Sequence, residues 1–413
     1  MIDNQKAISP SWTWALAAIA LTAFLVASLV SMASGPASAA DPGTCDPARP
    51  HAAGSFDETI TSGGVTREYI LYVPPSYTGA ETVPVVLNWH GLGSNASDQQ
   101  DYSELPAKAD EAGFIVAAPQ GLGDPASHNF TTIVPEPDSV LFTNDLLDEL
   151  ESQLCIDTAR VFSTGFSNGA QMSVRLACNL ADRFAAIAPV AGVYFPPWVA
   201  EISAEPPCSS TGPVPVIAFH GTADPLVPFD GGPGTLDLVF RDIDDEVLPE
   251  WAEHNGCAGV PTEEQAAPGV RLVRYADCDQ GATVELYVIE DADGAGPGTE
   301  GGGHTWPGST FVLPPETKAR IGLTTHEISA NDLMWDFFQA HALPAAEEPA
   351  PTPTSSVPQP TATALSVALP ATGAGGSSGG ANSAGWIIVA TAAAAGALAL
   401  GGAAWWVRRS DNR

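Results

Sequence analysis

Basic residues are scarce in this chain. Lysine and arginine together number 15, against 48 aspartates and glutamates, so the 413 residues carry a formal net charge of −33 at pH 7. A protein that binds nucleic acid needs a basic surface to neutralise the phosphate backbone. The composition therefore excludes nucleic acid as a partner, and it suits a protein that stays soluble outside the cell.

Cysteine is also sparse, and all six copies lie between the apolar stretches at the two ends of the chain. No CxxC or HxxxH spacing is present, so the cysteines and histidines give no support for a metal site. An even number of cysteines in an exported domain predicts three disulfides. Cys257 and Cys278 are expected to pair, because they lie close together and flank a hairpin-like loop. The spacing leaves the pairing of the other four open: Cys45, Cys155, Cys178 and Cys208.

The first apolar stretch runs from about Trp12 to Met32 and is preceded by one basic residue, Lys6. Small residues follow it, with Ala37 and Ala39 in an A-x-A arrangement. This order predicts a secretory signal peptide over residues 1–40. A retained membrane anchor is the alternative, because the apolar run is long.

The last apolar stretch, residues 385–407, is uncharged and long enough to span a bilayer, and Arg408 and Arg409 follow it at once. We predict a transmembrane segment there, with residues 408–413 as a basic cytoplasmic tail. Residues 344–384 are rich in Pro, Thr, Ser and Gly and cannot bury a core, so they are expected to form an extended stalk.

The stalk contains the sequence LPATG, with Leu369, Pro370, Thr372 and Gly373 as its defining residues. The order of this motif, an apolar helix and a basic tail resembles the sorting signal of surface proteins that a sortase links to the cell wall. The resemblance implies a sortase as partner, cleavage between Thr372 and Gly373, and contact with the membrane at least before processing. The alternative is a plain carboxy-terminal membrane anchor.

Residues 41–343 have the composition of one globular domain. An opening hairpin is indicated by DETITSGGVTREYILYV, and short apolar runs follow it in alternation with segments of helical periodicity. Continuous apolar runs fit strands that are buried on both faces of a sheet. The predicted fold class is therefore α/β, with a mostly parallel central sheet and helices on both faces. The expected strands span residues 83–89, 114–119, 160–164, 185–190, 214–219 and 284–289.

The strand at 160–164 leads directly into Gly165, Phe166, Ser167, Asn168 and Gly169, and then into a helix-like segment. A GxSxG sequence between a buried strand and a helix is typical of a nucleophile elbow. The glycines remove Cβ atoms that would block so tight a turn, and the helix N-terminus favours developing negative charge. Ser167 is therefore the predicted nucleophile.

A serine hydroxyl needs a base, and the base needs a group that fixes its tautomer. The strand at 214–219 ends in HGTADP, which places Asp224 in a loop after a strand, as the acid of such a triad requires. Asp230 and Asp237 lie farther from the strand and are weaker alternatives. His304, in the glycine-rich sequence GGGHTWPG after the last strand, is the predicted base. Three other histidines fit surface or packing roles better: His254, His326 and His341.

An oxyanion hole needs two backbone N–H groups that point at the developing charge. We predict the N–H of Asn168, the residue after the nucleophile, as one donor. The second is expected from the loop NWHGLGSN, with Leu92 as donor and Gly91 as the alternative, while His90 shapes the loop.

The segments WHGLGSN, GFSNGAQMSVRLAC, FHGTADPLVPFDGG and GGGHTWPG resemble the polyhydroxybutyrate depolymerase and feruloyl (acetylxylan) esterase group of the α/β-hydrolase superfamily. The resemblance covers about residues 45–341. It implies a triad of Ser167, Asp224 and His304, and an aromatic residue, Trp306, at the mouth of the substrate site. His128 stands where a tryptophan is usual, and an acidic insertion, EDADGAGPGTE, precedes the His304 loop.

Together these observations predict an extracellular, cell-surface serine ester hydrolase that works through an acyl-enzyme and needs no cofactor. The substrate is expected to be an ester on a polysaccharide or a short hydroxyalkanoate polyester. An acyltransferase with the same triad is a second possibility. A non-catalytic surface adhesin on a hydrolase scaffold is a third, since a fold alone does not fix a function.

Overall fold

The computed structural model describes residues 43–130, 138–194, 208, 212–234, 238–290 and 301–344. These residues all belong to one compact unit. The predicted signal peptide, the stalk with its LPATG sequence, the span at 385–407, the basic tail and most of the acidic insertion lie outside the described residues. Within the described part of the chain, no helix combines the length and apolarity needed to cross a membrane.

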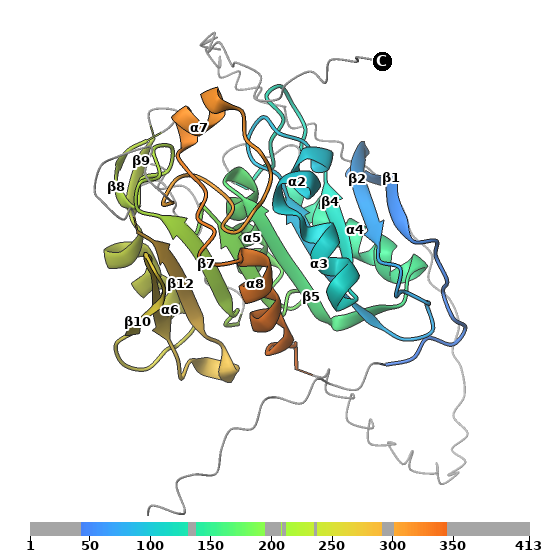
Figure 1. Ribbon diagram of the computed structural model, residues 1–413. Coiled ribbons are helices and arrows are strands. Elements are labelled where there is room, and N and C mark those ends of the chain that lie inside the picture. Colours follow the sequence, from blue (N-terminus) through green and yellow to red (C-terminus); the bar gives the residue numbers. More distant parts are fainter. Residues whose placement is uncertain are drawn as a thin grey trace, which may run out of the picture. The chain divides into compact units, whose positions relative to one another are not determined.

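A ten-stranded sheet forms the centre of the unit (Figure 1). The strand order is β1-β2-β4-β3-β5-β6-β7-β12-β11-β10, and the six strands from β4 to β12 in this order run parallel. The outer strands on both sides are antiparallel. The strands are β1 (Gly54–Ser62), β2 (Val65–Val73), β3 (Val83–Trp89), β4 (Ile115–Pro119), β5 (Ile156–Phe166), β6 (Ala186–Val190), β7 (Val216–Gly221), β10 (Thr262–Ala267), β11 (Val270–Tyr275) and β12 (Val284–Ile289), with β8 (Asp230–Pro233) and β9 (Val239–Asp242) in a separate two-stranded sheet.

Helices cover both faces of the large sheet, so the predicted α/β class with a mostly parallel sheet is confirmed. In Figure 1, α2, α3 and α8 lie in front of the sheet, and α4 and α5 lie behind it. The helices are α2 (Ala96–Ser103), α3 (Leu105–Ala112), α4 (Ser139–Gln153), α5 (Asn168–Asn179), α6 (Leu248–His254), α7 (Pro315–Ile321) and α8 (Ala330–Gln339), with a short π-helix at Ile243–Val247 and a 3₁₀ turn at Asp279–Gly281.

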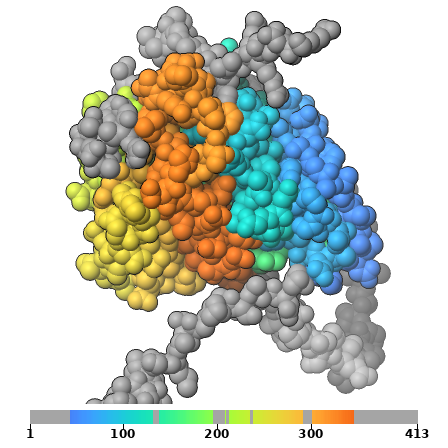
Figure 2. Space-filling view, in the orientation of Figure 1, coloured from blue at the N-terminus to red at the C-terminus, as the bar shows by residue number. Residues whose placement is uncertain are grey.

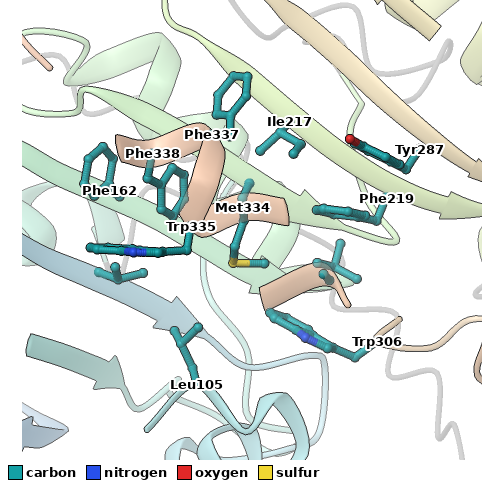
Figure 3. Packing of buried hydrophobic residues seen from close by; sticks show 14 of the residues in the cluster. Leu105, Phe162, Ile217, Phe219, Tyr287, Trp306, Met334, Trp335, Phe337 and Phe338 are labelled. Atoms are coloured by element: carbon teal, nitrogen blue, oxygen red, sulfur yellow. The ribbon is translucent and has the colours of Figure 1, made fainter. Parts of the chain in front are cut away.

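Successive side chains of each central strand pack into the cores on opposite faces of the sheet, because side chains alternate across a strand. Val86 of β3 packs with the helices in front, whereas Val85 and Leu87 pack with α4 and α5. Figure 3 shows the front core, in which Phe338 of α8 lies on Phe162 of β5, with ring centroids 4.3 Å apart. Burial on both faces explains why the parallel strands are rich in apolar residues and lack an alternation of apolar and polar positions.

The opening hairpin is confirmed, with β1 and β2 joined at the predicted SGG turn. The expected strands at 83–89 and 284–289 have the predicted bounds. The strand expected at 160–164 is longer, because β5 begins at Ile156 and continues to Phe166, beside the full length of β3. Its end therefore lies directly at Ser167.

Three disulfides connect the six cysteines, as the even count predicts. Cys257 pairs with Cys278 across the hairpin of β10 and β11, which confirms that prediction. The pairs that the sequence left open are Cys45 with Cys155 and Cys178 with Cys208. Disulfides of this kind persist in oxidising compartments.

The Cys45–Cys155 bond spans 110 residues and the Cys257–Cys278 bond spans 21. Loop-closure entropy predicts that loss of the longer link costs about 5 kcal/mol in the free energy of unfolding and loss of the shorter about 3 kcal/mol. We therefore expect urea titrations to show a lower midpoint for the Cys45→Ala/Cys155→Ala variant than for the Cys257→Ala/Cys278→Ala variant. The reverse order would contradict an unfolded-state origin of the stabilisation.

Candidate active site

Ser167 lies at the turn between β5 and α5, as the elbow sequence predicts. Its backbone has φ 56° and ψ −113°, a left-handed conformation that non-glycine residues rarely adopt. The surroundings hold this turn in place. A Cβ on Gly169 would collide with the backbone carbonyl groups of Trp89 and His90, and one on Gly165 would collide with the Gly169 carbonyl group. The two glycines are therefore required because three backbone segments meet at the elbow.

Asp224 and His304 come together although 80 residues separate them. His304 Nδ1 donates a hydrogen bond to Asp224 Oδ2 at 2.6 Å, and both side chains are almost fully buried. The loops that carry them are also joined, because the Ala223 N–H donates to the Gly302 carbonyl group at 2.9 Å. Use of Nδ1 in this bond leaves His304 Nε2 for proton transfer, as a general base of this type requires.

The carboxylate of Asp224 is held at both oxygens. Oδ1 accepts hydrogen bonds from the N–H groups of Leu226 and Val227, each at 2.9 Å. Oδ2 faces His220 Nε2 at 3.4 Å as well as His304. Burial alone would raise the pKa of Asp224, but the interactions with His304 and His220 outweigh it and lower the pKa below its ordinary value. The residue stays an anion at neutral pH.

The alternative acids do not share this position. Asp230 is exposed on β8, and Asp237 lies outside the described residues. His220 was not among the predicted site residues. Its position at the end of a strand, four residues before Asp224, could have indicated that it lies beside the acid.

His304 also lies beside the elbow. Its ring contacts the ring of Phe166, the residue before Ser167, with centroids 4.7 Å apart. Tyr102 of α2 packs edge-on against the same Phe166 ring, and its hydroxyl accepts a hydrogen bond from the Trp306 N–H at 2.9 Å. The end of β5, the His304 loop and α2 therefore form one packed unit.

The loop after β3 lies against the elbow, with Gly91 beside Phe166 and Ser167. The Gly91 carbonyl oxygen is fixed by His90 Nδ1 at 2.7 Å and by the Ser94 N–H at 3.1 Å. Because C=O and N–H point in opposite directions in a trans peptide, the N–H of Leu92 points away from these two donors. His90 thus orients the peptide that contains the predicted oxyanion donor.

Asn168 has a second role that the sequence did not reveal. Its side-chain Oδ1 accepts from the His128 N–H at 2.8 Å, and its Nδ2 donates to the His128 carbonyl oxygen at 3.3 Å. The His128 ring in turn packs against Trp89 and His90, at centroid distances of 4.9 and 4.3 Å. His128 therefore connects the loop after β3 with the first residue of α5.

Trp306 requires a correction. It was predicted to line the mouth of the substrate site, but its side chain is fully buried in the front core (Figure 3). Its indole Nε1 donates to Asn331 of α8 at 3.1 Å. The aromatic ring therefore anchors the His304 loop to the core, and it is not part of an open surface. Among the described residues no group of three or more histidine, cysteine or acidic side chains could hold a metal ion.

Two buried histidines next to the elbow predict a loss of stability in acid. Burial lowers the pKa of His90 to about 4, and burial with the nearby His90 and Arg67 lowers the pKa of His128 well below its ordinary value. In the unfolded chain both titrate near 6.5, so the unfolded state binds more protons as the pH falls below that value. The free energy of unfolding should therefore fall between about pH 6.5 and pH 4.

The variant His128→Gln tests this expectation. Removal of one titrating group should lower the slope of the free energy of unfolding against pH by up to about 1.4 kcal/mol per pH unit in this window. Urea unfolding at pH 7, 6 and 5 measures the slope for both proteins. Equal slopes would mean that His128 is not buried in its neutral form.

The fold and site define an α/β-hydrolase with a serine at the elbow. A family profile described as Phospholipase/Carboxylesterase matches residues 137–237, which include Ser167 and Asp224. A relative named "Putative esterase NocK" from Nocardia uniformis subsp. tsuyamanensis is 33% identical over 297 residues, which cover 67% of this chain and 80% of the relative. The chain belongs to the esterase group of the α/β-hydrolase superfamily, a group of carboxylic ester hydrolases.

Other relatives have more specific names. Feruloyl esterase D of Neurospora crassa is 30% identical, with coverage of 57% of this chain and 77% of the relative. Feruloyl esterase B of Piromyces equi is 32% identical, with coverage of 58% and 42%. The solved structure of an acetyl xylan esterase from Aspergillus awamori aligns with 68% of this chain and 99% of its own, at 15% identity and a TM-score of 0.45.

Proposed function

We propose that the protein is a serine carboxylic ester hydrolase that uses Ser167 as nucleophile, His304 as general base and Asp224 as the orienting acid. The observation that carries the proposal is the buried 2.6 Å hydrogen bond from His304 Nδ1 to Asp224 Oδ2. This bond holds the imidazole in one tautomer beside the elbow of Ser167. The low pKa of Asp224 supports its role, because an anion stabilises the imidazolium that forms during proton transfer.

The reaction proceeds in two steps. Ser167 Oγ attacks the ester carbonyl carbon while His304 Nε2 accepts the hydroxyl proton. The bond to the alcohol then breaks as His304 donates this proton to the leaving oxygen, which leaves an acyl group on Ser167. In the second step His304 takes a proton from water, the hydroxide attacks the acyl carbon, and the proton returns to Ser167 Oγ as the acid leaves.

We assign the oxyanion hole to the backbone N–H groups of Leu92 and Asn168. The fixed Gly91 carbonyl group supports Leu92, since it sets the direction of that peptide. The position of Asn168 at the start of α5 supports the second donor, because the first N–H groups of a helix have no acceptor within it. Donors that are already in place stabilise the tetrahedral intermediate without reorganisation.

The names of the relatives favour esters attached to plant polysaccharide, such as feruloyl or acetyl esters, over short polyesters. A panel of methyl ferulate, acetylated xylan and hydroxybutyrate oligomers tests this choice. We expect the largest kcat/KM on one of the first two. Preference for hydroxybutyrate oligomers would assign the enzyme to polyester, and a folded protein that cleaves no ester would overturn the proposal.

The three disulfides support export, and LPATG with the predicted span supports attachment to the cell surface. If a sortase processes the chain, mass spectrometry of the mature protein should find its carboxyl end at Thr372. Recovery of peptides that contain Arg408 from most molecules would contradict processing and leave the esterase proposal unaffected.

A further inference from the structure

A cavity of about 600 Å³ lies beside the His304 loop. Its walls come from the turn between β10 and β11, the end of β12 at Ile289 and Glu290, and the segments 309–313 and 322–327. Because β12 runs parallel to β7, whose own carboxyl end leads to Asp224, the cavity lies at the edge of the sheet that carries the candidate active site. Its volume falls within the range of pockets that bind small molecules.

One wall of the cavity is the layer directly behind the proposed base. The His304 N–H donates to the Ile321 carbonyl oxygen at 2.6 Å, and the Gly303 N–H and Thr305 Oγ1 both donate to the Leu323 carbonyl oxygen, at 3.4 and 3.3 Å. Leu323 lines the cavity. The segment from Ile321 to Leu323, which is hydrogen-bonded to the His304 loop, therefore lies between a molecule in the cavity and His304.

A second wall connects with the elbow through aromatic rings. Phe311 lines the cavity and packs edge-on against Tyr102, with centroids 5.9 Å apart, and Tyr102 contacts Phe166 next to Ser167. Figure 2 shows the surface of this segment in orange, between the yellow of β10 to β12 and the cyan of α2 and α3. One wall of the cavity is therefore packed, through Tyr102, against the residue that precedes Ser167.

The lining combines two kinds of surface. Phe311, Leu313 and Ile289 are apolar, whereas Thr324 and other polar groups provide hydroxyls. Sugar rings present C–H groups on their faces and hydroxyls at their edges, so they match a wall of this composition. A dry acyl pocket would instead be predominantly apolar.

Charged groups of both signs line the cavity, so its lining favours neither a strongly anionic nor a strongly cationic ligand. Glu290, Lys318 and Glu327 place both signs around the cavity, and Glu290 already faces Arg271 at 3.5 Å. The formal net charge of −33 repels polyanions from the whole molecule. A neutral sugar chain suits this cavity, because its hydroxyl groups bind hydrogen-bond donors as well as acceptors. It also carries no net charge that the acidic protein would repel.

We infer that this cavity binds a stretch of the neutral polysaccharide that carries the ester, apart from the place where the ester itself reacts. This role rests on the proposed ester hydrolase function: the cavity would hold the polymeric part of the substrate while the ester reacts at Ser167. Binding here adds affinity for a polymer without contact with the reacting atoms, so small esters gain nothing from it.

Thr324→Trp tests the inference, because an indole at this half-buried lining position would occupy part of the space that a sugar chain needs. We expect KM for acetylated xylan to rise about tenfold or more, while kcat/KM for p-nitrophenyl acetate changes less than about twofold. Val260→Trp is the matched control, since Val260 is 86% exposed and does not line the cavity. A second variant, Val312→Asp, alters the exposed rim without disturbing packing and should raise the same KM about threefold.

Binding can be measured without turnover. Titration calorimetry with xylohexaose on the Ser167→Ala protein should give heat of binding that Thr324→Trp abolishes and Val260→Trp leaves unchanged. Equal losses on acetylated xylan and p-nitrophenyl acetate would overturn the inference, because the wall would then only support His304. An unchanged KM on the polymer would overturn it as well. A wild-type protein that cleaves neither substrate would overturn the proposed function instead.

Discussion

Ser167→Ala is expected to lower kcat/KM for p-nitrophenyl acetate by at least about three orders of magnitude. The alanine removes Oγ, the proposed nucleophilic atom, while the proposed oxyanion donors and the imidazole of His304 remain. The fold should tolerate the change, because Ser167 Oγ makes no helix-capping hydrogen bond at the start of α5.

Initial rates with purified wild-type and variant protein measure the effect, with circular dichroism melts to confirm equal folding. Ser152→Ala is a suitable control, since this exposed serine donates only to the Glu149 carbonyl oxygen within α4. A Ser167→Ala protein that keeps more than about a tenth of the wild-type rate would exclude Ser167 as the nucleophile.

Asp224→Asn is expected to lower kcat by about three to four orders of magnitude, with a smaller effect on KM. The asparagine keeps the shape of the buried site but loses the negative charge that stabilises the protonated His304. Its amide can also donate to His304 Nδ1, which would force the proton onto Nε2 and block the acceptor that Ser167 needs.

Asp230→Asn is the matched control for this change. Asp230 comes from the same part of the sequence and was an alternative acid, but it is exposed on β8. Its variant should retain kcat within about twofold. If Asp230→Asn lost activity and Asp224→Asn kept it, the assignment of the acid would be wrong.

Much of the fold could be predicted from the sequence because its central strands are buried on both faces. Residues 83–89 and 284–289 are mostly apolar, with Asn88 and Glu285 as the exceptions, and the structure gives these strands the same bounds. The nucleophile elbow could be predicted equally well, because the strand, the GxSxG sequence and the helix are contiguous in the chain. Local patterns of this kind do not depend on distant contacts.

The parts that were missed depend on such distant contacts. The hydrogen bonds between Asn168 and His128 join residues 40 positions apart, and no periodicity indicates them. Trp306 was misplaced because a glycine-rich loop does not reveal which of its side chains turns toward the core. The packing of its ring beside α8 decides this, and α8 begins 24 residues later at Ala330.

The most direct test of the proposed active site is covalent labelling of the nucleophile. An aryl fluorophosphonate reacts with a serine only where a base activates the hydroxyl and an oxyanion hole holds the phosphoryl oxygen. We predict one adduct per molecule, on Ser167, in wild-type protein and in Asp230→Asn, and none in Ser167→Ala. Labelling at another serine, or none in active wild-type protein, would contradict the proposed site.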